Sequence, residues 1–130
     1  MACDVYVTAG STIQSGVDAA SAGQTVCVGP GSYGCSAGWA ATISKDLKVI
    51  GTDGASATII DCGGFGGGFY ASLLDTVTVQ GFTFRDAAGM SAGGVHAVDV
   101  LNVTVSECAF SSCQGSIAGA IACWRHKSWR

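Results

Sequence analysis

The chain has 130 residues, only 12% of them charged, and its formal net charge at pH 7 is −3. This length predicts one domain, and so few charges disfavour intrinsic disorder. Its 20 glycines disfavour long helices, because a glycine inside a helix costs about 1 kcal/mol relative to alanine. No stretch approaches the roughly 18 consecutive apolar residues of a membrane span. We therefore expect a β-rich domain without membrane insertion.

The charges are unevenly distributed. Half of the basic residues lie in the last seven positions, as Arg125, Lys127 and Arg130, so the rest of the chain carries three basic and nine acidic residues. An acidic body offers no basic surface for nucleic acid, and we expect no nucleic-acid partner. Asp4 interrupts the first residues and no apolar segment follows it, so no signal peptide is predicted.

The first predicted element is a short amphipathic helix in residues 11–20, "STIQSGVDAA". Ile13, Val17 and Ala20 recur at helical spacing. Ser11 and Gln14 have the spacing of a capping box, which predicts that the helix begins there. We expect this helix to cover the open end of a strand stack, although an ordinary surface helix would show the same pattern.

Strand-like segments then recur along the chain. "TVCVG" (25–29) and "LKVIG" (47–51) begin at a sequence spacing of 22, and a spacing of 30 leads from the second of them to Val77. "VTVQGFTF" (77–84) returns as "VTVSECAF" (103–110), and "GGFYAS" (67–72) returns as "GGVHAV" (93–98), both at a spacing of 26. A period in the twenties with strand-like units is typical of a solenoid.

The alternation inside the repeated segment predicts two short strands. Val77 and Val79 lie on one face, Phe82 and Phe84 follow the same period of two, and Gln80-Gly81 makes the corner between the pairs. Each strand would pair in parallel with its equivalent in the next coil. This stacking places Val77 over Val103 and Phe84 over Phe110.

The segments "TIQSGVDAASAGQTVCVGPGSY" (12–33) and "LKVIGTDGASATIIDCGG" (47–64) resemble the first coils of the pectin-lyase-like superfamily. The downstream coils are similar to the repeats of chlamydial polymorphic outer-membrane proteins, which alternate a Gly-Gly-Ala-aliphatic motif with a Phe-x-x-Asn motif. In this chain the segments "FRDA" (84–87) and "FSSC" (110–113) stand at the second motif and lack its Asn. The resemblance implies a right-handed parallel β-helix (β-solenoid) of about four coils with a short N-terminal capping helix. We expect a single domain over residues 1–123, with the cap in 3–24, coils starting near 25, 47, 77 and 103, and a tail in 124–130.

Enzymes of this superfamily generally use carboxylates, often with a basic residue, on adjacent coils of one face. The residues available for such a cluster are Asp61, Asp75, Asp86, Asp99 and Arg85. The register of the repeat places no two of these acids directly above one another, so we expect no catalytic residue, no metal site and no cofactor. A polysaccharide-active, lyase-like enzyme is the alternative.

We therefore expect a non-catalytic, structural or adhesive protein that binds carbohydrate or other copies of itself. The candidate binding residues are the outward-facing Thr78 and Thr104, which stack on adjacent coils, and the corner residues Arg85 and Asp86. A second alternative is an ice-binding solenoid, since such proteins carry flat threonine arrays.

Seven cysteines suggest a secreted or cell-surface protein with disulfides, although buried thiols are the alternative. The disulfide candidates are Cys3, Cys27, Cys35, Cys62, Cys108 and Cys113, and the seventh cysteine is Cys123. Cys108 and Cys113 would either form one disulfide within a coil or remain as two buried thiols. No CxxC pair is present, so no zinc site is expected. His96 and His126 are predicted to be surface residues.

Overall fold

The computed structural model describes residues 3–34, 39–62, 67–85, 88–89, 94–111, 114–115 and 121–124. This part of the chain contains one helix, α1 (Ile13–Ala19), and is otherwise built mainly from strands. The strands are β1 (Val5–Val7), β2 (Thr25–Val28), β3 (Gly31–Tyr33), β4 (Trp39–Ile43), β5 (Leu47–Gly51), β6 (Thr58–Asp61), β7 (Gly67–Gln80), β8 (Thr83–Arg85), β9 (Ala88–Gly89), β10 (Val95–Ser106), β11 (Ala109–Ser111), β12 (Gln114–Gly115) and β13 (Ile121–Trp124). Every pairing between these strands is parallel, which confirms the predicted strand-rich architecture with parallel sheets.

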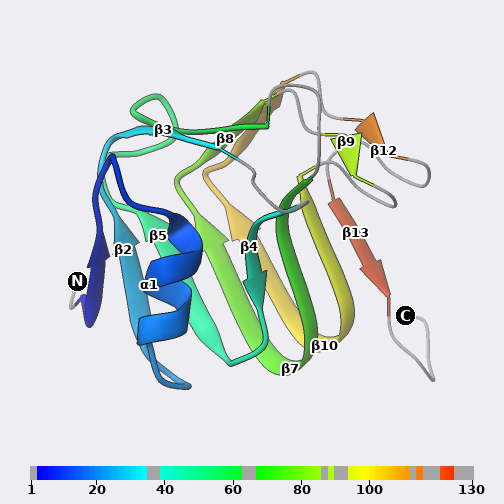
Figure 1. The fold of residues 1–130 in the computed structure, drawn as a ribbon. Helices are drawn as coiled ribbons and strands as arrows, with labels where there is room; N and C mark the ends of the chain where they lie inside the picture. The colour runs from blue at the N-terminus through cyan, green and yellow to red at the C-terminus, as the bar shows by residue number, and fades with distance from the viewer. Residues whose placement is uncertain are drawn as a thin grey trace.

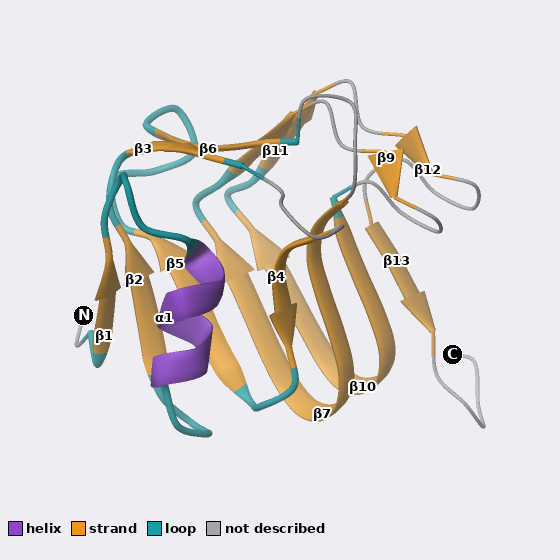
Figure 2. Ribbon diagram, in the orientation of Figure 1, coloured by secondary structure: helices purple, strands orange, loops and turns teal. Residues whose placement is uncertain are grey.

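The strands form layers around the core (Figures 1 and 2). A front layer contains β4, the first halves of β7 and β10, and β13. A rear layer contains β1, β2, β5 and the second halves of β7 and β10. The strands β3, β6, β8 and β11 form a third group that crosses the top of both layers in this view.

Two long strands belong to both the front and the rear layer because each bends at one residue. Leu73 in β7 has a φ of 59° and Asp99 in β10 has a φ of 56°. These two residues lie at the same place in paired strands, between Val98↔Ser72 and Val100↔Leu74. Left-handed backbone at one residue therefore turns each strand from the front layer into the rear layer.

The predicted repeat spacing of 26 is confirmed on all three sides. Val77 pairs with Val103 in the rear layer, Phe84 pairs with Phe110 in the third group, and Phe69 pairs with Val95 in the front layer. The predicted spacing of 30 is also confirmed, since Leu47 pairs with Val77.

The predicted spacing of 22 between β2 and β5 is wrong by one residue. The structure pairs Val26 with Val49 and Thr25 with Lys48, at a spacing of 23. A spacing of 22 would place Lys48 beside the buried Val26. Because a one-residue shift exchanges the two faces of a strand, burial of the apolar face fixes the register.

The core lies between the layers and is dominated by aromatic rings. The ring of Phe69 contacts those of Phe82 and Phe84 edge to face, with centroids 5.4 and 5.3 Å apart. Val77 and Val79 close the core from the rear layer, and all five side chains are buried. This confirms the inward face predicted for the repeated segment, including the corner at Gly81, whose φ is 81°.

The N-terminal helix is confirmed, but it begins one residue later than predicted. Thr12, not Ser11, is the N-cap: its Oγ1 accepts a hydrogen bond from the backbone N–H of Ser15 at 3.1 Å. Ser11 and Thr12 both carry the hydroxyl that an N-cap needs, so local pattern alone does not select the cap. Ile13 and Val17 face the core, as their helical spacing predicted.

Gln14 joins α1 to the side of β4 that faces away from β7. Its Oε1 accepts a hydrogen bond from the backbone N–H of Thr42 at 2.6 Å, and its Nε2 donates to the Thr42 carbonyl at 3.2 Å. The side-chain amide thus replaces the neighbouring strand that this edge would otherwise need. At the other end of the helix, the Lys45 ammonium donates to the carbonyls of Val17 and Ala20 at 2.8 and 2.6 Å. The helix therefore covers one edge of the front layer.

The tail predicted for residues 124–130 begins within a strand. Trp124 is the last residue of β13 and pairs with Val98, so the repeat extends one residue beyond the expected boundary.

Candidate functional site

The outward face of the rear layer carries a row of polar side chains across four neighbouring strands. Thr25 pairs with Lys48, Lys48 pairs with Thr78, and Thr78 pairs with Thr104. In-register residues of parallel strands project to the same side of a sheet, and neighbouring strands lie about 4.8 Å apart. The predicted ladder of Thr78 and Thr104 is thus part of a longer row that also contains Thr25 and Lys48.

Further polar side chains flank this row on the same face. Two positions before Thr78 in β7, Thr76 pairs with Asn102 of β10. Two positions after Thr78, Gln80 pairs with Ser106. Hydroxyl and amide groups both donate and accept hydrogen bonds. The face therefore offers both donors and acceptors at regular intervals.

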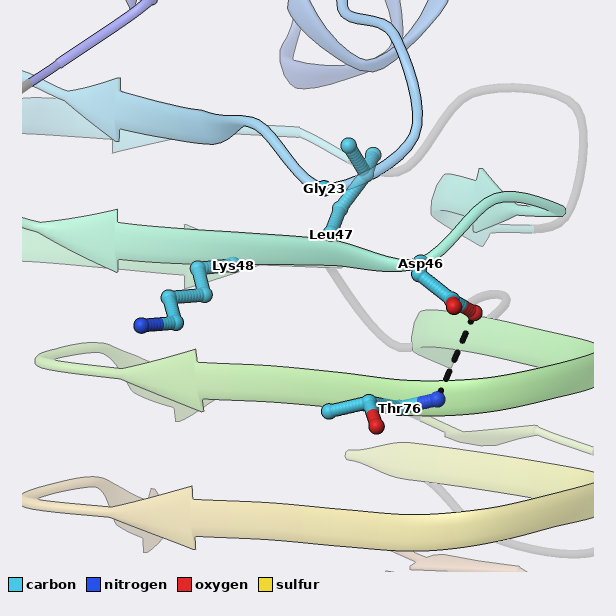
Figure 3. A pocket seen from close by; sticks show the side chains of 5 residues that line it. All are labelled: Gly23, Asp46, Leu47, Lys48 and Thr76. Atoms are coloured by element: carbon cyan, nitrogen blue, oxygen red, sulfur yellow. Dashed lines mark hydrogen bonds between the residues drawn. The ribbon is translucent and has the colours of Figure 1, made fainter.

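A shallow pocket of about 230 Å³ opens on this face. It is lined by Gly23, Asp46, Leu47, Lys48 and Thr76 (Figure 3). The Lys48 side chain extends away from Asp46 along the strand, and the Thr76 side chain lies on the strand below it. The Asp46 carboxylate, the Thr76 hydroxyl and the Lys48 side chain thus border a partly apolar hollow.

Asp46 forms hydrogen bonds that link the segments lining this pocket. Its Oδ1 accepts hydrogen bonds from the backbone N–H groups of Asp75 at 2.9 Å and Thr76 at 3.3 Å. Its backbone carbonyl accepts from the N–H of Gly23 at 2.6 Å. Asp46 therefore connects three successive segments of the chain. Sequence reasoning missed this role, because the predicted spacing of 30 places Asp46 beside Thr76 but does not show that its side chain turns to the backbone of the next coil.

The predicted corner residue Arg85 lies elsewhere, in β8 of the third group. Its guanidinium donates to the Asp61 carboxylate at 2.7 Å, and the two residues pair in register between β6 and β8. Arg85 is thus engaged in an ion pair on a different side of the molecule from Thr78 and Thr104. Asp86, its predicted partner in a binding site, lies outside the described residues.

The other acidic candidates are dispersed. Asp75 and Asp99 occupy different positions in β7 and β10, and Asp99 lies opposite Leu73. Within the described part of the chain, no group of three or more His, Cys, Asp or Glu side chains is arranged to hold a metal ion. The same residues contain no helix that is long and apolar enough to cross a membrane.

The prediction that His96 is a surface residue is wrong, since only 8% of it is exposed. Its imidazole packs against the rings of Tyr70 and Trp39, with centroids 5.2 and 6.0 Å away, on the outward side of the front layer. Its Nδ1 is buried and has no hydrogen-bond partner among the described residues. Burial lowers the pKa of His96, so the neutral form is favoured. Its neighbours come from β4 and β7, a placement that local sequence does not reveal. His126 lies outside the described residues.

Four cysteines have side chains that the structure describes, and they are found in two chemical states. Cys3 and Cys27 form a disulfide between the segment before β1 and β2, and Cys62 is also disulfide-bonded. Cys108 carries a free, half-buried thiol, so the structure favours the thiol alternative at this position. Burial raises the pKa of Cys108 and keeps it protonated. The remaining candidates, Cys35 and Cys113, lie outside the described residues.

Comparisons of the chain with protein-family models, with curated proteins and with solved structures gave no match. The resemblance to the pectin-lyase-like superfamily therefore rests on the sequence segments alone.

Proposed function

We propose that the protein is a non-catalytic binding module that holds an extended, neutral polysaccharide along the outward face of its rear layer. The observation that carries this proposal is the in-register row of Thr25, Lys48, Thr78 and Thr104. A polymer with repeating hydroxyl groups meets successive hydrogen-bonding side chains along such a row. Each contact is weak, but contacts made by one chain on one surface act together.

The charges around the row favour a neutral rather than an acidic polymer. Lys48 is exposed, but the Asp46 carboxylate lies against the backbone of Asp75, and Asp75 is itself an exposed acidic residue of β7. The Asp4 carboxylate accepts from the N–H of Thr25 at 2.9 Å, which adds a third negative charge at the other end of the row. An acidic polysaccharide would meet more negative than positive charge, whereas a neutral one loses nothing to repulsion.

We further propose that the fold is a right-handed parallel β-helix of about four coils, and that the protein is secreted or displayed on a cell surface. Parallel pairing at sequence spacings of 23, 30 and 26 supports the coil arrangement. The Cys3–Cys27 disulfide supports an oxidising, extracellular location.

Binding to insoluble and soluble polysaccharides tests the function. Thr78→Tyr places a bulky ring in the middle of the row, and Ser32→Tyr makes the same kind of change on the exposed side of β3, away from the row. Loss of two hydrogen bonds of about 1 kcal/mol each predicts at least tenfold weaker binding for Thr78→Tyr. Ser32→Tyr should bind as the wild type does. Equal binding by both variants, or binding of acidic polymers only, contradicts the proposal.

The same experiment separates the alternatives. Release of soluble fragments from a polysaccharide, abolished in Arg85→Ala, would assign a lyase-like enzyme. Thermal hysteresis lost in Thr78→Tyr would assign ice binding, although Lys48 interrupts the threonine array that such a surface needs.

A further inference from the structure

Burial falls off sharply between equivalent positions of the last two coils of the rear layer. Val77 and Val79 in β7 are at most 1% exposed. Their in-register partners in β10, Val103 and Val105, are apolar as well but only partly buried. Phe110 repeats the pattern against the fully buried Phe84, on which its ring stacks at 5.1 Å. Inward-facing core side chains thus lie partly uncovered at this end of the stack.

The backbone at the same place has one partner strand among the described residues. The second half of β10 pairs with β7 over its whole length, whereas β13 pairs only with Val95–Val98 of the first half. In the described part of the chain, the outer N–H and C=O groups of residues 100–106 therefore have no neighbouring strand. Such an edge is a template for another strand.

This edge lacks the features that usually prevent strand addition. Residues 100–106 read "VLNVTVS", with no charged residue and no proline. Natural edge strands are commonly protected by lysine, proline, a bulge or a covering element. The opposite end of the molecule has such protection, because α1 covers β4 and Gln14 hydrogen-bonds its edge, while β1 is only three residues long.

We propose that this edge of β10 is the docking surface for a second copy of the chain, which pairs with it antiparallel about a two-fold axis through Thr104. Around this axis Val103 lies opposite Val105 of the second copy, so the two partly covered cores join. Asn102 lies opposite Ser106, which places amide and hydroxyl groups together on the outward side. Glu107 lies opposite Leu101, so no two acids oppose each other.

The strand at the opposite edge of the rear layer decides the kind of assembly. An open filament needs the β10 edge of one copy to meet this opposite edge in the next copy, which is β1, and β1 offers only three residues, Val5–Val7. The remaining arrangement joins two β10 edges and closes as a dimer. The β10 edge adjoins the polysaccharide row, since Thr104 is the last residue of that row, but the dimer depends on the partly buried Val103 and Val105 and on the backbone of β10, so it stands whether or not glycan binds.

Sedimentation of the full chain without ligand tests the dimer. We expect a mass that rises with concentration from 12.9 kDa to about twice that value and no further. Thr104→Lys places two like charges at the axis and should abolish the dimer. Thr78→Lys makes the same change one strand further in and should retain it.

A cysteine pair checks the geometry directly. Directly opposite residues of an antiparallel pair have Cα atoms about 4.5–5.5 Å apart, within disulfide range, so Thr104→Cys should cross-link to itself under mild oxidation. The same residue in Thr78→Cys would lie about 14 Å from its copy, three strand spacings away, and should not cross-link.

Three results would overturn the proposal. One is a monomer at every concentration, and another is growth beyond a dimer. The third is a monomer that dimerises only after residues 125–130 are removed. That result would mean that the chain's own C-terminal residues, and not a second copy, cover the edge in the intact protein.

Discussion

Truncating the stacked pair Phe84 and Phe110 measures how steeply the core weakens toward the last coil. The ring of Phe84 is fully buried and contacts the rings of Phe69, Phe82 and Phe110. Phe110 occupies the same position one coil later and is only partly buried. Truncation of a buried Phe to Ala costs about 3–5 kcal/mol, because transfer and cavity terms add.

From this contact environment we expect Phe84→Ala to lower the free energy of unfolding by about 4 kcal/mol. Phe110→Ala removes a side chain that is already partly in water, so a loss of about 2 kcal/mol is expected. The free energy of unfolding of a domain is about 5–15 kcal/mol. A protein in the upper part of this range keeps both variants folded in the absence of denaturant.

Urea unfolding followed by tryptophan fluorescence gives both values. The variants are compared in the Thr104→Lys background, where association cannot bury Phe110. An unchanged dependence of the free energy on urea concentration shows that the change in midpoint reports stability. Equal losses for the two variants would refute the graded core and remove the main support for an open β10 edge.

Three further predictions concern single groups outside the aromatic core. Lys45→Ala removes the ammonium that binds the last carbonyls of α1 and should lower the unfolding free energy by about 1–2 kcal/mol, whereas Lys48→Ala should change it little, as thermal unfolding will show. The double substitution Cys3→Ser and Cys27→Ser, which removes a disulfide between positions 24 apart, should cost about 3 kcal/mol in the same assay. Because burial lowers the pKa of His96, the unfolded state binds more protons below about pH 6.5, so stability should be fully present above that pH and fall as the pH falls toward the folded-state pKa. His96→Gln should flatten this dependence, and an unaltered pH profile would show that His96 is not its origin.

The repeated segment predicted much of the strand arrangement because stacked copies keep the same residue types at the same places. Val77 over Val103 and Phe84 over Phe110 follow from identity at a fixed spacing. The link between β2 and β5 has a single identical pair, Val26 with Val49, and there the one-residue choice depends on keeping Lys48 out of the core.

The parts that sequence did not predict depend on contacts between distant segments. His96 is buried because Trp39 and Tyr70 lie beside it on neighbouring strands, and no local pattern encodes that contact. Asp46 likewise acts through the backbone of the next coil, at Asp75 and Thr76. The threonine ladder was visible from the repeat, and the predicted spacing of 30 also places Lys48 beside Thr78, but the extension to Thr25 required the corrected register.

The docking of Gln14 on Thr42 also bears on how the chain folds. Paired strands follow one another at sequence spacings of 23, 30 and 26, so each new segment needs only the segment before it as a template. Stacked repeats with nearest-neighbour contacts can grow by propagation from one nucleus. The helix and its amide contact complete the N-terminal end with residues made early in synthesis. We therefore expect folding to proceed during translation, from the capped end toward β10, with the last coil ordering last.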